Sequence, residues 1–490
     1  MMKRHIYIAS LLMLGSLTFQ SCTKDFVEKN TNPNAVAAAA PQSLLAPALV
    51  NLLSTNLSRN LRINNELMQV TVTVNDNLEI QRYEIRPSES ESSWSGWYVQ
   101  LTNIRDMYQK AFAGQQKGYQ TYQGISLILD AWVSSMITDM YGDVPYFDSN
   151  KGFSEGNLTP KFDKQEDIYK DIFRKLEEAN TLLKENVVVE SANTAMDPIY
   201  NSDPTKWRKF GNSLYLRLLL RVAHKTETNA VAKIKEILET NAAEYPIMQS
   251  NAETAAVYYT NVQPYMNPNF TMRDFDFNRS KGYAEFLINN LMDLGDPRLK
   301  IWATEASLGV YGGMQSGYRR GNVPEIQSTL QLALKSDAHM GNIMNYAELQ
   351  FIIAECALRN YVELDASEAY TKGINGAMEY WGTTVPQGYL ANPKVIFSAE
   401  DSETQKLKKV HLQKYFAMMY TDFQQWYEYR RTQLLDLYKG PGLLNNGKMP
   451  VRLNYPIIVQ SLNRENYQDA VSRMGGDGIN EKMWWQPTIN

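Results

Sequence analysis

Two indole side chains lie close together in a segment of small residues. Trp94 and Trp97 occur in the run Ser-Ser-Trp-Ser-Gly-Trp-Tyr, which ends at Tyr98. Flat indole faces stack on sugar rings or on peptide side chains, and the ring N–H groups can donate hydrogen bonds to hydroxyls or carbonyls. The pair is therefore a candidate ligand-binding surface. The alternative is that at least one of the two indoles packs at the start of the helix that follows.

A second group of aromatic side chains lies among asparagine and proline residues in the middle of the chain. Its members are Tyr258, Tyr259, Tyr265 and Phe270. Aromatic surface combined with short amide groups is typical of a ligand-binding loop. Tyrosine-rich loops also fill gaps between layers of a large protein, and that alternative stays open for each residue.

A third group lies in the glycine-rich segment 309–321. Tyr311 and Tyr318 are its aromatic residues, and Arg319 and Arg320 follow them. Glycines allow a loop to move and to approach a ligand closely. The glycines do not follow a predicted strand and do not match a phosphate-binding loop. We therefore interpret this segment as a mobile recognition loop.

The N-terminal residues indicate export and lipid attachment. Two basic residues precede an apolar run, which ends in Leu-Thr-Phe-Gln-Ser-Cys at 17–22. The run has the length of a secretory signal and is too short to span a bilayer, which needs about 20 apolar residues. We expect residues 1–21 to be removed and Cys22 to carry acyl chains such as palmitate; an ordinary secretory signal is the alternative. Residues 22–41 are polar and alanine-rich, as in a tether.

The other chemistry-bearing residues form no recognisable catalytic or metal motif. The histidines are far apart in the sequence, without a second histidine at metal-ligand spacing, and neither Gly-x-Ser-x-Gly nor His-Glu-x-x-His occurs. Asp274 and Asp276 resemble the start of a calcium-binding loop, but Arg279 stands where that loop requires glycine. We expect no catalytic residue, no bound metal and no cofactor.

Charge and cysteine content exclude two further classes. The chain has 49 basic and 53 acidic residues, a formal net charge of −4, and no basic patch that favours nucleic acid. Cys356 is the only cysteine besides Cys22. With Cys22 acylated no intramolecular disulfide can form, and the apolar neighbours of Cys356 predict a small core residue.

Pairs of amphipathic helices are the main secondary structure that the sequence predicts. Asp163 and Glu166 have the spacing of a capping box at one helix start, and Arg217 and Arg221 are expected to pair with acids of a neighbouring helix. Helix pairs of this size are typical of tetratricopeptide solenoids. The predicted pairs are 98–113 with 122–140, 166–184 with 206–222, 346–359 with 366–381, and 403–420 with 423–438.

The predicted fold class is therefore mostly α, with about four tetratricopeptide-like helix pairs in one domain, 42–490. The helical scaffold covers 98–222 and 345–438. An irregular, aromatic-rich insertion, 226–340, separates its halves and opens with one further helix. A capping segment, 441–490, closes the chain and ends near two tryptophans that are expected to hold it down. Long insertions on a helical scaffold commonly form the binding surface.

Several sequence blocks resemble one known family. With Cys22 they resemble the SusD/RagB-like outer-membrane lipoproteins, and in particular the nutrient-binding SusD-like branch of the Bacteroidetes. They span the mature chain in the order of that family. The blocks are Asn-Thr-Asn-Pro-Asn at 30–34, Met-Tyr-Gly-Asp-Val-Pro-Tyr at 140–146, Asn-Ser-Leu-Tyr-Leu-Arg at 212–217, Ala-Glu-Cys-Ala at 354–357, Trp-Tyr-Glu-Tyr-Arg-Arg-Thr at 426–432 and Val-Arg-Leu-Asn-Tyr-Pro at 451–456.

The resemblance implies a function at the cell surface. A protein of this family is a lid on a SusC-like TonB-dependent porin, and it passes captured oligosaccharides or oligopeptides into the barrel without breaking a bond. It is held at the outer membrane by its lipid. The residues themselves leave two alternatives open. These are a surface glycoside hydrolase or peptidase, and a tetratricopeptide scaffold that binds no ligand.

Overall fold

Paired helices form most of the folded chain, as the periodicity predicts, and the mostly α fold class is confirmed. The computed structural model describes residues 39–114, 116 and 118–487. Residues Pro41–Asn490 form one unit by their contacts, and the description below concerns that unit. The predicted signal peptide, Cys22 and nearly all of the tether lie outside the described residues.

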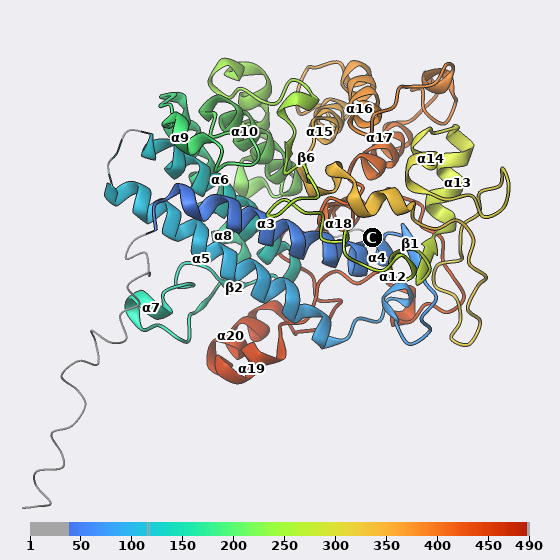
Figure 1. Ribbon diagram of the computed structural model, residues 1–490, viewed down its shortest axis with the longest axis horizontal. Coiled ribbons are helices and arrows are strands. Elements are labelled where there is room, and N and C mark those ends of the chain that lie inside the picture. Colours follow the sequence, from blue (N-terminus) through green and yellow to red (C-terminus); the bar gives the residue numbers. More distant parts are fainter. Residues whose placement is uncertain (1–38, 115, 117, 488–490) are drawn as a thin grey trace, which may run out of the picture. The chain divides into compact units, whose positions relative to one another are not determined.

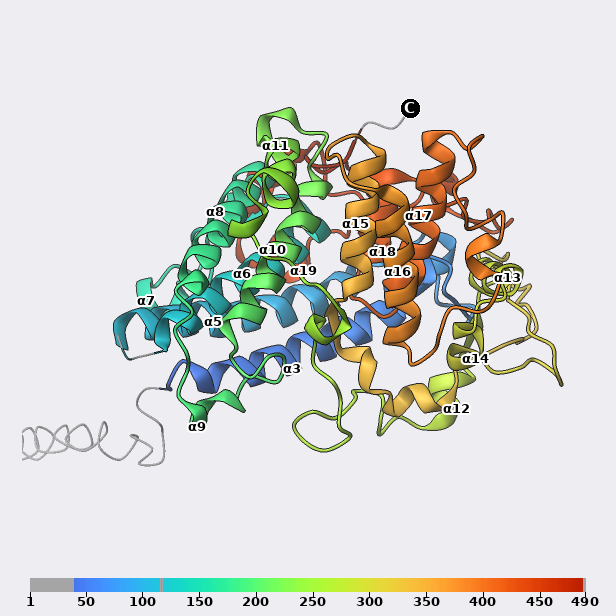
Figure 2. The same ribbon diagram turned by 90° about the horizontal axis from the view of Figure 1, so that it is seen from above.

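The first half of the scaffold contains two helix pairs and one helix that the sequence analysis missed. The pairs are α5 (Glu91–Gly114) with α6 (Tyr119–Tyr141) and α8 (Gln165–Lys184) with α10 (Pro204–Arg221). The missed helix, α3 (Gln42–Arg59), packs along α5. Nearly all of α6 is buried because α5 and α8 cover it on two sides (Figure 2).

The second half contains the other two pairs. They are α15 (Tyr346–Leu358) with α16 (Ala366–Tyr380) and α17 (Glu403–Ala417) with α18 (Gln424–Thr432). Helix α18 ends earlier than predicted because Gln433 takes a left-handed conformation, with φ of 51°. Helix α15 packs against α10, which joins the two halves (Figures 1 and 2).

Buried ion pairs accompany the contacts between helices. Arg217 of α10 donates to both carboxylate oxygens of Glu348 on α15, at 2.7 and 2.6 Å, and both side chains are buried. Arg221 pairs with Asp139 of α6. The prediction that both arginines pair with acids of neighbouring helices is confirmed, and the bidentate geometry is the one that a guanidinium prefers.

Side-chain caps mark several helix starts, but not the predicted one. Asp203, Asp365 and Ser402 accept hydrogen bonds from the first-turn N–H groups of α10, α16 and α17. The capping box predicted at Asp163 is wrong, because α8 begins after Lys164 without a side-chain cap. Asp163 instead accepts from the backbone N–H groups of the turn at 146–147.

The insertion is less irregular than predicted. It contains α11 (Ala230–Lys235), the short π-helix η5 (Glu236–Thr240), β4 (Ala255–Ala256), α12 (Asp274–Asn278), β5 (Lys281–Tyr283), α13 (Glu285–Leu294) and α14 (Arg298–Trp302). Strand β5 pairs with β1 (Thr71–Thr73), and β4 pairs with β6 (Asn342–Met344), both antiparallel. These short pairings attach the insertion to segments on both sides of it.

The remaining elements are short. They are η1 (Asn60–Asn64), α4 (Asn65–Leu67), η2 (Ile80–Arg82), η3 (Pro87–Ser90), β2 (Val144–Pro145) paired with β3 (Phe162–Asp163), α7 (Gly152–Glu155), α9 (Ser191–Thr194), η4 (Thr226–Thr228), η6 (Ala242–Glu244), η7 (Asn251–Glu253), η8 (Leu332–Ser336), η9 (Ala338–Gly341), η10 (Tyr389–Ala391), η11 (Asn445–Gly447), α19 (Ile457–Leu462) and α20 (Arg464–Met474). Near the C-terminus Trp485 is fully buried between the guanidinium groups of Arg221 and Arg430, so it holds this segment to the scaffold.

Candidate functional site

An aromatic cluster with one exposed face lies where β4 and β6 bring distant segments together. Tyr258 follows β4, and 41% of it is exposed. Its ring meets the ring of His339 edge-on, with centroids 5.7 Å apart. His339 also contacts Tyr380 and Trp381 at the end of α16, at 5.1 and 5.8 Å. With Asp337 these residues are called the Tyr258–His339 cluster below.

The hydrogen bonds of the cluster determine what His339 offers to a ligand. Its Nδ1 lies 2.9 Å from Oδ1 of Asp337, which also accepts from the backbone N–H of His339 at 2.7 Å. A carboxylate only accepts, so Nδ1 carries a proton, and in the tautomer that this contact selects Nε2 has the lone pair. About a third of the His339 side chain is exposed, at 34%. It can therefore accept a hydrogen bond from a hydroxyl or an amide.

Tyr258 adds an apolar face and a donor to this arrangement. Burial raises the pKa of its hydroxyl, which therefore stays protonated at neutral pH. Tyr380 is buried, contacts the ring of His339 and donates a hydrogen bond to the carbonyl of His339 at 2.8 Å. Tyr258 is thus a partly exposed ring held by an edge-on contact with His339, and such a ring can stack on a flat ligand. The sequence analysis considers the histidines only as zinc ligands, so it does not identify His339 as a candidate hydrogen-bond acceptor beside Tyr258.

The loop that follows Tyr258 is attached to the same region. Asn267 donates to the carbonyls of Leu334 and Asp337, at 3.2 and 3.1 Å. Tyr265 is half-buried, and its carbonyl accepts from the N–H of Thr260 at 2.8 Å. Tyr265 thus stays a candidate beside Tyr258.

Tyr259 does not share this position. It is 96% buried, and its backbone N–H donates to the carbonyl of Ala338 at 3.1 Å. The prediction that it contacts ligand is wrong, because its side chain is buried in the hydrophobic core, as the packing alternative stated.

The glycine-rich segment is held in place rather than free. The hydroxyl of Tyr318 donates to the carbonyl of Thr73 at 3.0 Å, and the guanidinium of Arg82 lies over its ring. The N–H of Gly321 donates to Asp76 at 2.7 Å. Tyr318 is fully buried, so its predicted contact with ligand is wrong. Tyr311 is half-buried and stays a candidate.

The two indoles of α5 differ in their environments. Trp97 is fully buried, donates from Nε1 to Asn56 Oδ1 at 2.7 Å, and meets Phe423 edge-on. The prediction that it presents a face to ligand is therefore wrong. Trp94 is half-buried and packs against Tyr98 and Tyr141, at 4.8 and 5.0 Å between ring centroids. It keeps some exposed surface but contacts none of the insertion aromatics.

The predicted residues therefore do not converge on one site. Tyr258 and Tyr265 lie at the β4–β6 pairing, Tyr311 lies in the segment beyond α14, and Trp94 lies on α5. The insertion nevertheless carries many of the large exposed apolar side chains, a property that ligand surfaces share. They are Tyr258, Val262, Phe270, Met272, Phe275, Met292, Leu308, Val310, Val323, Ile326 and Leu332.

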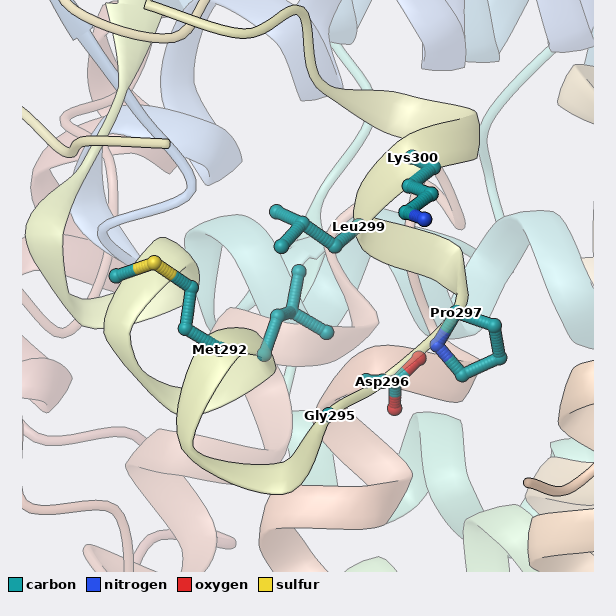
Figure 3. Close-up of a pocket in the computed structure, with 7 residues that line it drawn as sticks. Met292, Gly295, Asp296, Pro297, Leu299 and Lys300 are labelled. Carbon is teal, nitrogen blue, oxygen red and sulfur yellow. The ribbon is translucent and has the colours of Figure 1, made fainter. Parts of the chain in front are cut away.

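A pocket of about 370 Å³ lies at the turn between α13 and α14 (Figure 3). None of the predicted site residues lines it. Its apolar lining comes from Leu291, Met292 and Leu299. The carboxylate of Asp296 is already used, because it accepts from Arg298 and from the hydroxyl of Tyr389, at 2.6 and 2.9 Å. With its main acid engaged, the pocket offers few polar groups, and the Tyr258–His339 cluster is the better candidate.

Two clusters of acidic residues could attract a metal cation, but their carboxylates already pair with lysine or arginine side chains. Glu355, His411 and Glu428 are buried close together, but Arg431 lies within 2.7 Å of both carboxylates. Asp274 and Asp276, the calcium-like pair of the sequence, lie on α12 and pair with Lys335 and Arg273. Neither arrangement leaves the open oxygen cage that calcium requires.

No helix in the described part of the chain combines the length and the apolar character that crossing a membrane requires. The described helices therefore supply no transmembrane segment.

Comparisons with known proteins agree on one family. The model of a family described as "Starch-binding associating with outer membrane" matches residues 33–456. A SusD homologue from Bacteroides fragilis is 24% identical, with a TM-score of 0.79, and the match covers 92% of this chain and 100% of that one. A chitin-binding SusD homologue from Flavobacterium johnsoniae is 21% identical, with a TM-score of 0.76. That match covers 92% of this chain and 98% of the homologue. These identities show a shared fold. No curated protein matches the chain.

Proposed function

Because the chain belongs to the SusD-like family, described as starch-binding and associating with the outer membrane, we propose that it is a nutrient-binding lipoprotein of the cell surface. It captures oligosaccharides or oligopeptides and delivers them to a SusC-like TonB-dependent transporter. It catalyses no reaction on them. Acyl chains on Cys22 hold it at the outer membrane.

The observation that carries this proposal is the Tyr258–His339 cluster. It combines an exposed aromatic face, a hydroxyl donor and an imidazole acceptor within one small area. A sugar ring or an apolar peptide side chain can stack on Tyr258 while a hydroxyl or N–H group donates to Nε2 of His339. These contacts are reversible and place no nucleophile or acid pair against the ligand, as capture and release require.

The cluster also contains its own reporter. Trp381 lies 5.8 Å from the imidazole of His339, measured between ring centroids, and is 94% buried. Occupation of the site changes the environment of this indole through the histidine. Intrinsic tryptophan fluorescence can therefore follow binding without a label.

The first test is a titration of the acyl-free chain that begins at Thr23. Oligosaccharide and oligopeptide mixtures are added separately while tryptophan fluorescence is recorded. A saturable change with one class, lost in Trp381→Phe and weakened in Tyr258→Ala, is the expected result. The absence of a change with both classes, together with normal nutrient uptake in a deletion strain, would overturn the proposal.

Two further measurements test the other parts of the proposal. Metabolic labelling with palmitate should mark the wild-type protein and not Cys22→Ser. Product analysis of the titrated mixtures should find the oligomers intact. Hydrolysis that disappears on substitution of one Asp or Glu would instead establish a surface hydrolase.

A further inference from the structure

Helix α19 has no fully buried residue and exposes most of its apolar side chains; Val459 is partly buried and packs against the core. Ile457, Ile458 and Leu462 are its large exposed residues. A short amphipathic element normally stabilises itself by burying such side chains against a neighbour. Since α19 packs only Val459 in this way, its other apolar side chains are available for a partner outside the chain.

A second apolar group lies beside it. Phe153 of α7 is fully exposed, at 107% of its reference area, and Leu158 is 80% exposed. The chain after Leu158 is bonded to the other group, because Asn463 donates to the carbonyl of Pro160 at 2.7 Å. Both α7 and α19 lie along the lower edge of Figure 1, and we call this surface the α7–α19 face. It consists of Phe153, Leu158, Ile457, Ile458 and Leu462.

Three cations around the α7–α19 face form no ion pair, while most of the other charges there are paired. Lys161, Lys164 and Arg464 are exposed, and among the described residues no carboxylate lies within ion-pairing distance of them. Glu465 is the exposed acid of these segments that also lacks such a pair, whereas Glu155 lies 3.7 Å from Lys151. The face therefore combines exposed apolar side chains with three exposed cations that form no ion pair.

We propose that the α7–α19 face rests on an anionic lipid surface and orients the tethered body there. Apolar side chains enter the boundary between headgroups and acyl chains, while Lys and Arg contact the phosphates. The cores of protein interfaces, in contrast, are depleted of Lys, so the flanking cations favour lipid over a protein partner. This inference rests on the proposed lipid anchor.

The length of the tether makes a weak lipid contact sufficient. The 19 residue steps from Cys22 to Pro41 span at most about 65 Å when extended. A tether of this length gives the body an effective concentration at the membrane in about the millimolar range. The face then needs only modest affinity to set which side of the body meets the lipid.

Vesicle flotation of the acyl-free chain from Thr23 tests this proposal. The vesicles are phosphatidylcholine alone or with phosphatidylglycerol. The wild type is expected to float with the anionic vesicles, more weakly as salt is raised. Phe153→Ser with Leu158→Ser is expected to reduce the bound fraction about ten-fold, since each buried methylene contributes to insertion, and Lys161→Gln with Lys164→Gln should reduce the salt dependence.

A matched control comes from the insertion. Leu308 is 97% exposed and Phe275 66%, so Leu308→Ser with Phe275→Ser removes a comparable exposed leucine and phenylalanine without touching the α7–α19 face, and this variant should leave flotation unchanged. Equal thermal unfolding of all variants confirms that they are folded. Because the substitutions lie outside the Tyr258–His339 cluster, ligand titration of the same proteins separates failure of this inference from failure of the proposed function.

Two outcomes would overturn the proposal. One is that the wild type does not float with either vesicle. The other is that the Phe153/Leu158 variant floats like the wild type. If that variant also no longer co-purifies with a membrane protein from cells, the face is assigned to a protein partner instead.

Discussion

Removal of the Tyr258 ring is the sharpest test of the ligand site. The exposed part of this residue is 41%. A fully covered tyrosine side chain buries about 200 Å². A ligand that covers the exposed 41% of Tyr258 therefore removes about 80 Å² of its surface from water. At about 25 cal/mol per Å² that contact contributes about 2 kcal/mol. Tyr258→Ala is therefore expected to raise the dissociation constant about 30-fold.

The assay is the fluorescence titration, run beside urea unfolding of the same protein. A matched control exists in Tyr438, which is also 41% exposed and meets Phe286 edge-on, outside the Tyr258–His339 cluster. Tyr438→Ala should lose about as much stability as Tyr258→Ala and keep the wild-type affinity. If the two substitutions change affinity equally, or if Tyr258→Ala changes it less than about 3-fold, about 0.7 kcal/mol, the assignment of the site is refuted.

Three further results are expected. Trp97→Phe should lower the free energy of unfolding by about 1–3 kcal/mol in urea, because Asn56 loses its buried donor, and should leave affinity unchanged; an affinity loss without destabilisation would return Trp97 to the ligand site. Glu348→Gln should lower the free energy of unfolding by about 3–5 kcal/mol, because the Arg217 charge stays buried without its partner. Replacing both Arg217 and Glu348 by Met should recover most of that loss, and equal losses for the single and double variants would contradict this reasoning. Burial raises the pKa of Cys356 to about 12, so a thiol reagent at pH 8 should modify it only after unfolding, and fast reaction of the folded protein would contradict its buried position.

The helix pairs could be predicted because their signal is local. Apolar residues such as Ile168, Ile172 and Leu176 recur at helical spacing, and in α8 they form the buried stripe that the spacing requires. Missed elements lacked such a signal. Helix α3 contains Pro47 and follows an alanine-rich lead-in, and α13 lies within a segment dominated by aromatics, glycine and proline. The early end of α18 depends on the backbone conformation of Gln433, which no periodicity reports.

The sequence by itself determined the helical scaffold, the family and the segment that carries the aromatic residues, because periodicity and motif order are properties of neighbouring residues. Only the tertiary structure decided which aromatics are exposed. Trp97 is buried by its contact with Asn56 on α3, and Tyr318 by Thr73 and Arg82.

The same reason explains the candidate site. Tyr258 contacts His339 only because β4 pairs with β6. Burial and side-chain contact are set by segments that are distant along the chain, so residue type and spacing alone cannot distinguish a binding face from a core ring.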